Sequence, residues 1–168
     1  MVIPIKQINT RKLDMRLKHP FTTSFGTVDH KELFVIEVTD DEGNRGFCES
    51  VAFSVPWYTE ETVNTVFHII EEFLIPILRK KEITHPDDVS QAFKAIKRNH
   101  MAKAAIEGAV WDLYAKRERI SLARALGGER KQIDVGISIG IQPTIKELLK
   151  VIEGAVQEGY KRIKLKIK

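Results

Sequence analysis

Basic and apolar side chains alternate through residues 162–168, which read Arg-Ile-Lys-Leu-Lys-Ile-Lys. Successive side chains of a β-strand point to opposite faces, so the apolar residues would share one face and the basic residues the other. Ammonium groups at Lys164 and Lys166 would disfavour each other's protonation, so one of them can release its proton and act as a base. Such a lysine can remove a proton next to a carboxylate if a metal ion stabilises the resulting enediolate. A solvated edge strand, on which lysines discourage aggregation, explains the same pattern.

The residues before this lysine strand predict a βαβ unit. A strand is expected at residues 133–141, and Thr144 stands three residues before Glu147, as in a helix-capping box. The helix is expected to run to about Glu158, where Gly159 stops it, and the lysine strand follows at residues 161–168. Strands of such a sheet are normally buried on both faces, so cations near their carboxyl ends are costly unless a site needs them. This context favours a chemical role for the two lysines.

The earlier residues predict strands first and helices afterwards. Strands are expected at residues 2–17 and 33–39, and a turn at residues 40–44 leads to a hairpin partner at residues 45–49. Apolar residues at helical spacing predict helices at residues 60–75, 87–97, 101–117 and 122–126. Pro76 should kink or end the first helix. The third carries a surface of small residues and should lie centrally. The later change to a βαβ pattern predicts two domains with a boundary near residues 127–132.

Composition limits the kind of protein. The chain has 168 residues, 43% of them apolar and 30% charged, with a net charge of +4 from scattered basic residues. We expect a soluble globular protein that binds no nucleic acid. The longest apolar stretch, residues 73–78, is too short to span a membrane, and no signal peptide is recognisable, so we expect no membrane partner. Cys48 is the single cysteine, which favours a reducing compartment, and we predict a cytoplasmic location. The five histidines fall in no metal-ligand spacing.

Four stretches of the chain together resemble one known family. They are residues 20–27, 101–113, 135–141 and 159–168, and their order and spacing are similar to those of the muconate-lactonising subgroup of the enolase superfamily. Within it, the strands around Ser138 and Lys164 most resemble those of o-succinylbenzoate synthases and N-acylamino acid racemases. The resemblance implies an α+β capping domain, an antiparallel meander plus helices, at residues 1–128. It implies the first βαβ unit of a (β/α) barrel at residues 129–168.

The resemblance also implies roles for particular residues. Lys166 would be the catalytic lysine, and Lys164 the neighbour whose charge favours loss of its proton. Ser138 would touch the substrate at the end of the first barrel strand. Residues 21–27 would form a mobile lid, and its substrate-binding members would be Phe21, Thr22, Ser24, Phe25 and Gly26. Residues 50–57 would form a second loop that helps close the pocket.

Structural roles explain several of these residues as well. Phe21 and Phe25 would also suit a hairpin loop pinned to its own domain, and Ser138 could bond to neighbouring backbone. Trp57 and Pro56 suit packing within the capping domain as well as substrate contacts. Glu49 and Asp112 match family positions, but helix capping or a buried ion pair explains them equally.

The implied activity is a Mg²⁺-dependent one that takes an α-proton from a small carboxylate substrate. A synthase would then expel hydroxide to give o-succinylbenzoate, a menaquinone precursor, and a racemase would reprotonate the other face. Dipeptide epimerase is an alternative, and a non-catalytic binding or assembly module is an alternative of a different class. The family's acidic metal ligands and its opposite lysine lie beyond Lys168, so we expect the chain alone to be inactive. We also expect a homo-oligomer that associates through the strand edge at residues 163–168.

Overall fold

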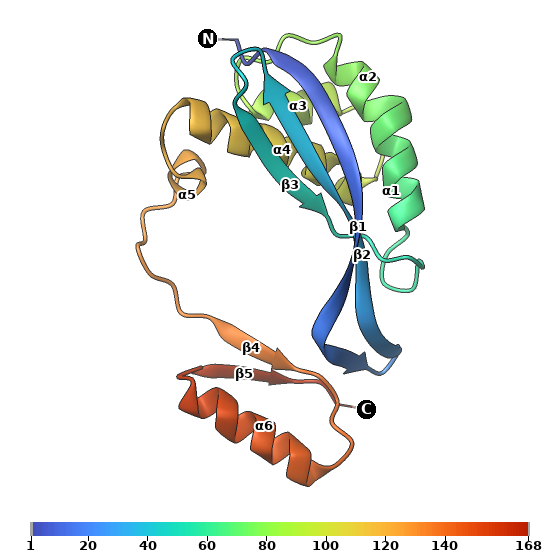
Figure 1. Cartoon of the computed structure of the whole chain (residues 1–168), viewed down its shortest axis with the longest axis vertical. Helices are drawn as coiled ribbons and strands as arrows, with labels where there is room; N and C mark the ends of the chain where they lie inside the picture. The colour runs from blue at the N-terminus through green and yellow to red at the C-terminus, as the bar shows by residue number, and fades with distance from the viewer. Residues whose placement is uncertain (1, 168) are drawn as a thin grey trace. The chain divides into compact units, whose positions relative to one another are not determined.

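The structure is a computed structural model that describes residues 2–167 (Figure 1). Contacts divide the chain into two compact units. The first contains the residues up to Asp14 together with Glu32–Glu129, and the second contains Met15–Lys31 together with the residues from Arg130 onwards. The second unit therefore includes a segment from near the start of the chain, which a boundary drawn by sequence position does not capture. The assignment of residues 1–128 and 129–168 to separate domains stays a prediction.

Three strands form an antiparallel meander in the order β1-β2-β3. They are β1 (Ile5–Thr23), β2 (Gly26–Asp40) and β3 (Arg45–Ser50). The register of β2 and β3 runs from Phe34 opposite Ser50 to Thr39 opposite Arg45, which confirms the predicted hairpin. β1 extends to Thr23, beyond the predicted strand end at residue 17. Residues 21–27 are therefore the two strand ends and the tight turn that joins β1 to β2.

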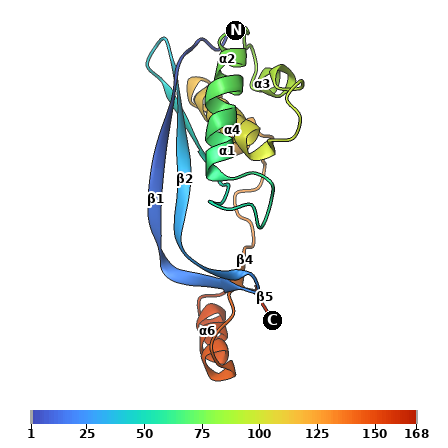
Figure 2. The same cartoon turned by 90° about the vertical axis from the view of Figure 1, so that its right-hand side faces the viewer.

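The helices of the first unit lie on one face of the meander (Figure 2). The first helical stretch consists of α1 (Val63–Ile69), a π-helical segment η1 (Ile70–Leu74) and α2 (Ile75–Leu78). Pro76 was expected to kink or end this helix. The winding changes from a π-helix to an α-helix next to Pro76, and the helix ends two residues after it, at Leu78. Proline has no backbone N–H to donate, and the wider π turn immediately before it, closed by the Ile75 N–H on the Ile70 carbonyl, accommodates this loss.

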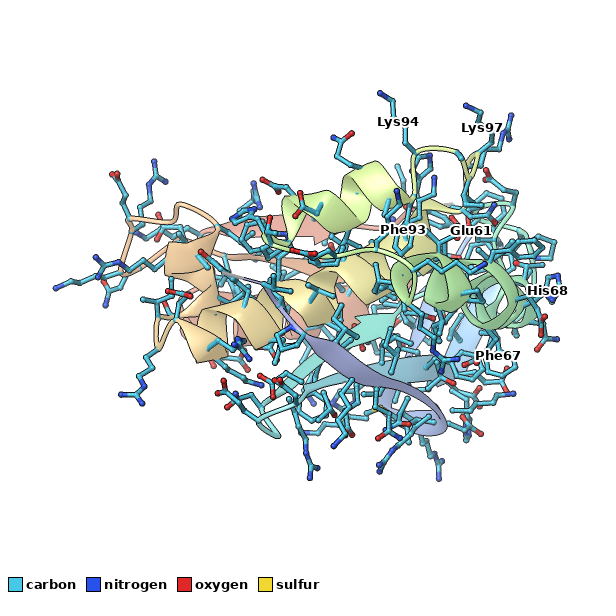
Figure 3. The ribbon with its side chains drawn as sticks, turned by 90° about the horizontal axis from the view of Figure 1, so that it is seen from above. Glu61, Phe67, His68, Phe93, Lys94 and Lys97 are labelled. Atoms are coloured by element: carbon cyan, nitrogen blue, oxygen red, sulfur yellow. The ribbon has the colours of Figure 1, made fainter. Side chains whose placement is uncertain are left out.

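The remaining helices of this unit are α3 (Asp87–Ala92), α4 (His100–Arg117) and α5 (Leu122–Ala125). α3 ends before the predicted residue 97, because the chain turns at Phe93 and adopts a left-handed backbone at Arg98 and Asn99. Phe93 is buried in the core, whereas Lys94 and Lys97 point outward (Figure 3). None of the described helices is both long enough and apolar enough to cross a membrane.

α4 lies against β3, and its small residues allow the close approach of another element that the sequence predicted. A methyl group placed on Gly46 would lie 2.1 Å from the carbonyl oxygen of Ala109, and one on Gly108 would lie 2.6 Å from the sulfur of Cys48. Both glycines therefore permit a helix-to-strand approach that any side chain would block. Ala102, Ala105 and Ala109 are fully buried, and this confirms that the helix is central.

A buried ion pair joins the β2–β3 turn to the last turn of α4. Arg117 contacts the Asp40 carboxylate, whose side chain is fully buried, and Asn44 donates to it from its backbone at 2.7 Å and its amide at 2.8 Å. Burial opposes ionisation of Asp40, but the hydrogen bonds from Asn44 and Arg117 outweigh it and lower the pKa of this carboxyl. The hydrogen bond to Asp40 likewise raises the pKa of Arg117.

The second unit contains the predicted βαβ elements, with β4 (Gly136–Ile139), α6 (Ile145–Gln157) and β5 (Arg162–Leu165). β4 and β5 are parallel and hydrogen-bonded, which confirms the fold class predicted for the barrel start. Both strands are shorter than expected. Thr144 caps α6 by accepting from the Glu147 amide at 3.2 Å, and Gly159 follows the helix with a φ of 91°.

Candidate functional site

The register of the two parallel strands brings the predicted site residues into one row. Ser138 lies directly opposite Lys164, between the pairs Gly136–Arg162 and Ile139–Leu165. Residues opposite each other in a sheet point to the same face, so the Ser138 hydroxyl and the Lys164 ammonium share a face of the β4–β5 pair. Ile139 alternates with Ser138 and is buried, as is Ala155 of α6. The polar face is thus the one directed away from the buried apolar side chains.

Lys166 continues this row at the carboxyl end of β5. Its backbone N–H donates to the carbonyl of Ile139 at 3.0 Å, so the pairing of the two strands extends one residue beyond β5. Lys166 is half-buried and Lys164 is exposed. If strand alternation continues through Lys166, the side chains of Lys164 and Lys166 share one face with Ser138 at the carboxyl end of the parallel pair. This end is where active sites of (β/α) barrels lie.

The end of the β1–β2 hairpin belongs to the same unit and reaches β4. The backbone N–H of Ile141 donates to the carbonyl of Thr22 at 3.0 Å. The hydroxyls of Thr22 and Thr27 are hydrogen-bonded at 2.9 Å, and the Phe25 N–H donates to the Thr23 hydroxyl at 3.2 Å. The hairpin end is therefore held at Thr22 and closed by its own threonines.

The five predicted lid residues divide into two groups. Phe21 and Thr22 are half-buried at the strand end beside Gly140, whereas Ser24, Phe25 and Gly26 form the exposed turn. Phe25 is 77% exposed, and Gly26 has a φ of 149°, a backbone conformation that L side chains rarely adopt. The structure brings the first group, and not the turn, to the carboxyl end of β4.

Other predicted residues lie in the first unit. In the second predicted loop, the ring centroid of Phe53 lies 5.0 Å from that of Trp57 and 6.0 Å from that of Tyr58, so this loop forms its own aromatic cluster. Asp112 accepts from the Phe47 amide at 2.8 Å and from the Lys116 ammonium at 2.7 Å, which supports the structural explanation for this carboxylate.

Glu61 is a buried carboxylate that sequence reasoning missed. It accepts hydrogen bonds from the Met101 amide at 2.9 Å and the Ala102 amide at 3.1 Å, so it caps α4 from a segment about forty residues away (Figure 3). A capping residue usually stands directly before its helix, where Asn99 has no side-chain hydrogen bond to the helix. A cap that arrives from a distant segment leaves no local signal in the sequence.

The described residues do not assemble a metal site. No three His, Cys, Asp or Glu side chains within residues 2–167 lie close enough together to hold an ion. Residues 2–167 therefore supply no ligand set of their own for the Mg²⁺ that the family resemblance implies.

Comparison with known proteins defines the class. Residues 6–127 match the family model of the mandelate racemase / muconate lactonizing enzyme N-terminal domain, which is most of the chain. The chain belongs to this family of the enolase superfamily. A member of the enolase superfamily from Listeria innocua has a solved structure with a TM-score of 0.92 at 40% identity, covering 99% of this chain and 45% of that one.

Curated relatives show to which enzymes the chain is similar. The chain is 58% identical over 168 residues to the o-succinylbenzoate synthase of Geobacillus stearothermophilus, and 38% identical over 164 residues to the N-succinylamino acid racemase of Thermus thermophilus. It spans 45% and 44% of their lengths, with 100% and 98% of this chain covered. A dipeptide epimerase of Enterococcus faecalis, in a complex with Mg and a dipeptide, has a TM-score of 0.82 at 26% identity, covering 98% of this chain and 46% of that one.

Proposed function

We propose that the full-length protein is an enzyme that removes the α-proton of a small carboxylate substrate and forms an enediolate. Its reaction would be o-succinylbenzoate synthesis by dehydration, racemisation of N-acylamino acids, or both, because the two reactions share this first step. The observation that carries the proposal is the row of Ser138, Lys164 and Lys166 at the carboxyl end of the β4–β5 pair. The similarity to synthases and racemases supports the same reaction type.

Each residue has a role in this proposal. Lys166 takes the α-proton, and the adjacent ammonium of Lys164 favours the neutral, basic form of Lys166 by charge repulsion. The Ser138 hydroxyl contacts the substrate together with Phe21 and Thr22, which lie beside Gly140. Ser24, Phe25 and Gly26 of the exposed turn would have to move towards β4 to contact it. We include Mg²⁺ as the cofactor of the full-length protein, with ligands from outside residues 2–167. A homo-oligomeric state, a cytoplasmic location and a place in menaquinone synthesis complete the proposal.

The decisive experiment is deuterium exchange at the substrate α-carbon in D₂O, followed by NMR with the full-length protein. We expect Lys166→Ala to slow exchange by about 10²–10⁴-fold, the usual contribution of a general base. The matched control is Lys161→Ala. Its side chain is 80% exposed and lies 3.8 Å from Asp134 at the other end of the strand, so this variant should retain full activity. Exchange near the wild-type rate in Lys166→Ala would remove Lys166 from the mechanism.

A second variant tests the role of Lys164. Without the neighbouring positive charge, Lys166 would hold its proton to higher pH, so Lys164→Ala should shift the pH–rate profile upward. The measurement is the pH dependence of α-proton exchange. A profile that matches the wild type would leave Lys164 as a structural residue of β5.

Dipeptide epimerase remains the alternative within the superfamily, and a non-catalytic binding or assembly module remains the alternative outside it. Parallel assays with an N-succinylamino acid, a dipeptide and the hydroxylated precursor of o-succinylbenzoate separate the first set of choices. An absence of exchange with all three would favour the non-catalytic module.

A further inference from the structure

Gly140, directly after β4, faces the backbone of the β1–β2 hairpin. A methyl group placed on Gly140 would lie 3.0 Å from the carbonyl oxygen and 3.2 Å from the amide nitrogen of Thr22, and 3.5 Å from Cδ2 of Phe21. The two shortest of these contacts are to main-chain atoms, which cannot rotate away as the end of a long side chain can. A methyl group at this position therefore requires these main-chain atoms to shift by a few tenths of an ångström, and a larger side chain requires more.

A hydrogen bond from the next residue holds the hairpin in this place. The Ile141 N–H donates to the Thr22 carbonyl at 3.0 Å, so the same Thr22 main chain is both contacted by Gly140 and bonded by Ile141. Thr22 is therefore a point at which β1 is attached to the residues that follow β4. Beyond this point the turn at Ser24 and Phe25 is closed by the threonine hydrogen bonds and is exposed.

The contact between Gly140 and the hairpin lies on the same face of β4 as the candidate site. Gly140 directly follows β4, so alternation continued by one residue beyond Ile139 puts a side chain at this position on the face of Ser138 and Lys164. We infer that Gly140 is a positioning residue. Because Gly140 has no side chain, Thr22 and Phe21 can lie at the carboxyl end of β4, on the face that carries Ser138. In this place they contact the substrate. The substrate contact rests on the proposed function, whereas the placement of the hairpin end by Gly140 does not.

The substitutions Gly140→Ala and Gly140→Val test, in the full-length protein, whether a side chain at residue 140 displaces the hairpin end. Hydrogen exchange measured by mass spectrometry, without substrate, reports the Ile141 amide. Loss of its hydrogen bond to Thr22 should speed exchange by about tenfold in Gly140→Val, with a smaller effect in Gly140→Ala. Gly154→Val is the matched control, because a Cβ atom on Gly154 of α6 would meet no atom within 4 Å apart from the backbone of its own helix. An unchanged exchange rate of the Ile141 amide in folded Gly140→Val would overturn the positioning role of Gly140.

Steady-state kinetics test the link to substrate binding. A displaced hairpin end should lower kcat/KM of Gly140→Val by about tenfold, mostly through a higher KM, because Phe21 and Thr22 would contact substrate and not the reacting proton. The Gly154→Val control should change neither constant. A loosened Ile141 amide with unchanged KM and kcat would overturn the role of the hairpin end in substrate binding.

Replacement variants cover the case in which a valine at residue 140 prevents folding. If Gly140→Val does not fold, Gly140→Ala and Ile141→Pro replace it, since proline removes the N–H that binds Thr22 without adding a side chain at residue 140. An unchanged Ile141 amide in Gly140→Ala, or an unchanged KM in Ile141→Pro, would again contradict the positioning role of Gly140. Absence of turnover in the wild type would contradict the proposed function. The amide hydrogen-exchange measurement would still decide whether Gly140 positions the hairpin end.

Discussion

The two units differ in how much apolar surface they bury. In the first unit the core includes fully buried side chains from β2, α1, α3 and α4, among them Ile36, Val66, Val89 and Ile106. In the described part of the second unit, Ile139 and Ala155 are the buried apolar residues, while Ile133 and Ile145 are 71% and 77% exposed. A two-stranded parallel pair with one helix has little area to bury. Stability therefore belongs mainly to the first unit, and the candidate chemistry to the second.

The largest expected effect on stability comes from emptying the first core. Ile106→Ala should lower the free energy of unfolding by about 2–5 kcal/mol, because the fully buried side chain leaves a cavity in α4. The matched change in the second unit, Ile145→Ala, removes a largely exposed side chain and should cost less than about 0.5 kcal/mol. Urea unfolding followed by circular dichroism measures both. Equal losses would contradict the proposed difference between the units.

A smaller effect should follow from filling the helix–strand contact. Gly46→Ala places a methyl group 2.1 Å from the carbonyl oxygen of Ala109 and should cost about 1–3 kcal/mol through overpacking. Gly154→Ala in α6 has open space and should instead stabilise by about 0.5–1 kcal/mol, since alanine favours helix. Thermal unfolding of the two variants should give shifts of opposite sign. A stabilised Gly46→Ala variant would mean that α4 and β3 can separate at little cost.

The buried ion pair of the first unit makes its stability sensitive to acid. The folded-state pKa of Asp40 is lowered, so its contribution is complete above the unfolded value of about 3.9 and is lost as pH falls through the folded value. Asp40→Asn should cost about 1–3 kcal/mol at pH 7, because it leaves Arg117 without its buried partner.

Unfolding free energies at pH 7 and below pH 4 test this prediction. The wild type should lose stability over this range more steeply than Asp40→Asn does. A variant that loses stability in parallel with the wild type would show that other carboxylates govern acid unfolding. Asp41→Asn is a suitable control, because Asp41 is exposed in the same turn.

Local patterns in the sequence determined much of this fold. The β2–β3 hairpin, the small-residue face of α4, the Thr144 cap and the βαβ order follow from neighbouring residues, which set turn, capping and strand alternation. Alternation along residues 162–168 also predicted that Lys164 and Lys166 share a face. The end of β1 and the early end of α3 were not foreseen, since neighbouring elements and backbone strain decide such boundaries.

Contacts between distant segments were decided only by the tertiary structure. The sequence does not reveal that Glu61 caps α4, that Asp112 binds the backbone of β3, or that the Ile141 amide binds Thr22. Each of these contacts joins a side chain or backbone group to a main-chain group from another element, and every residue type carries such backbone groups. The residue types therefore give no sign of the partner. The lysine row could be recognised from sequence because its spacing is local, whereas the seating of the hairpin beside it required the fold.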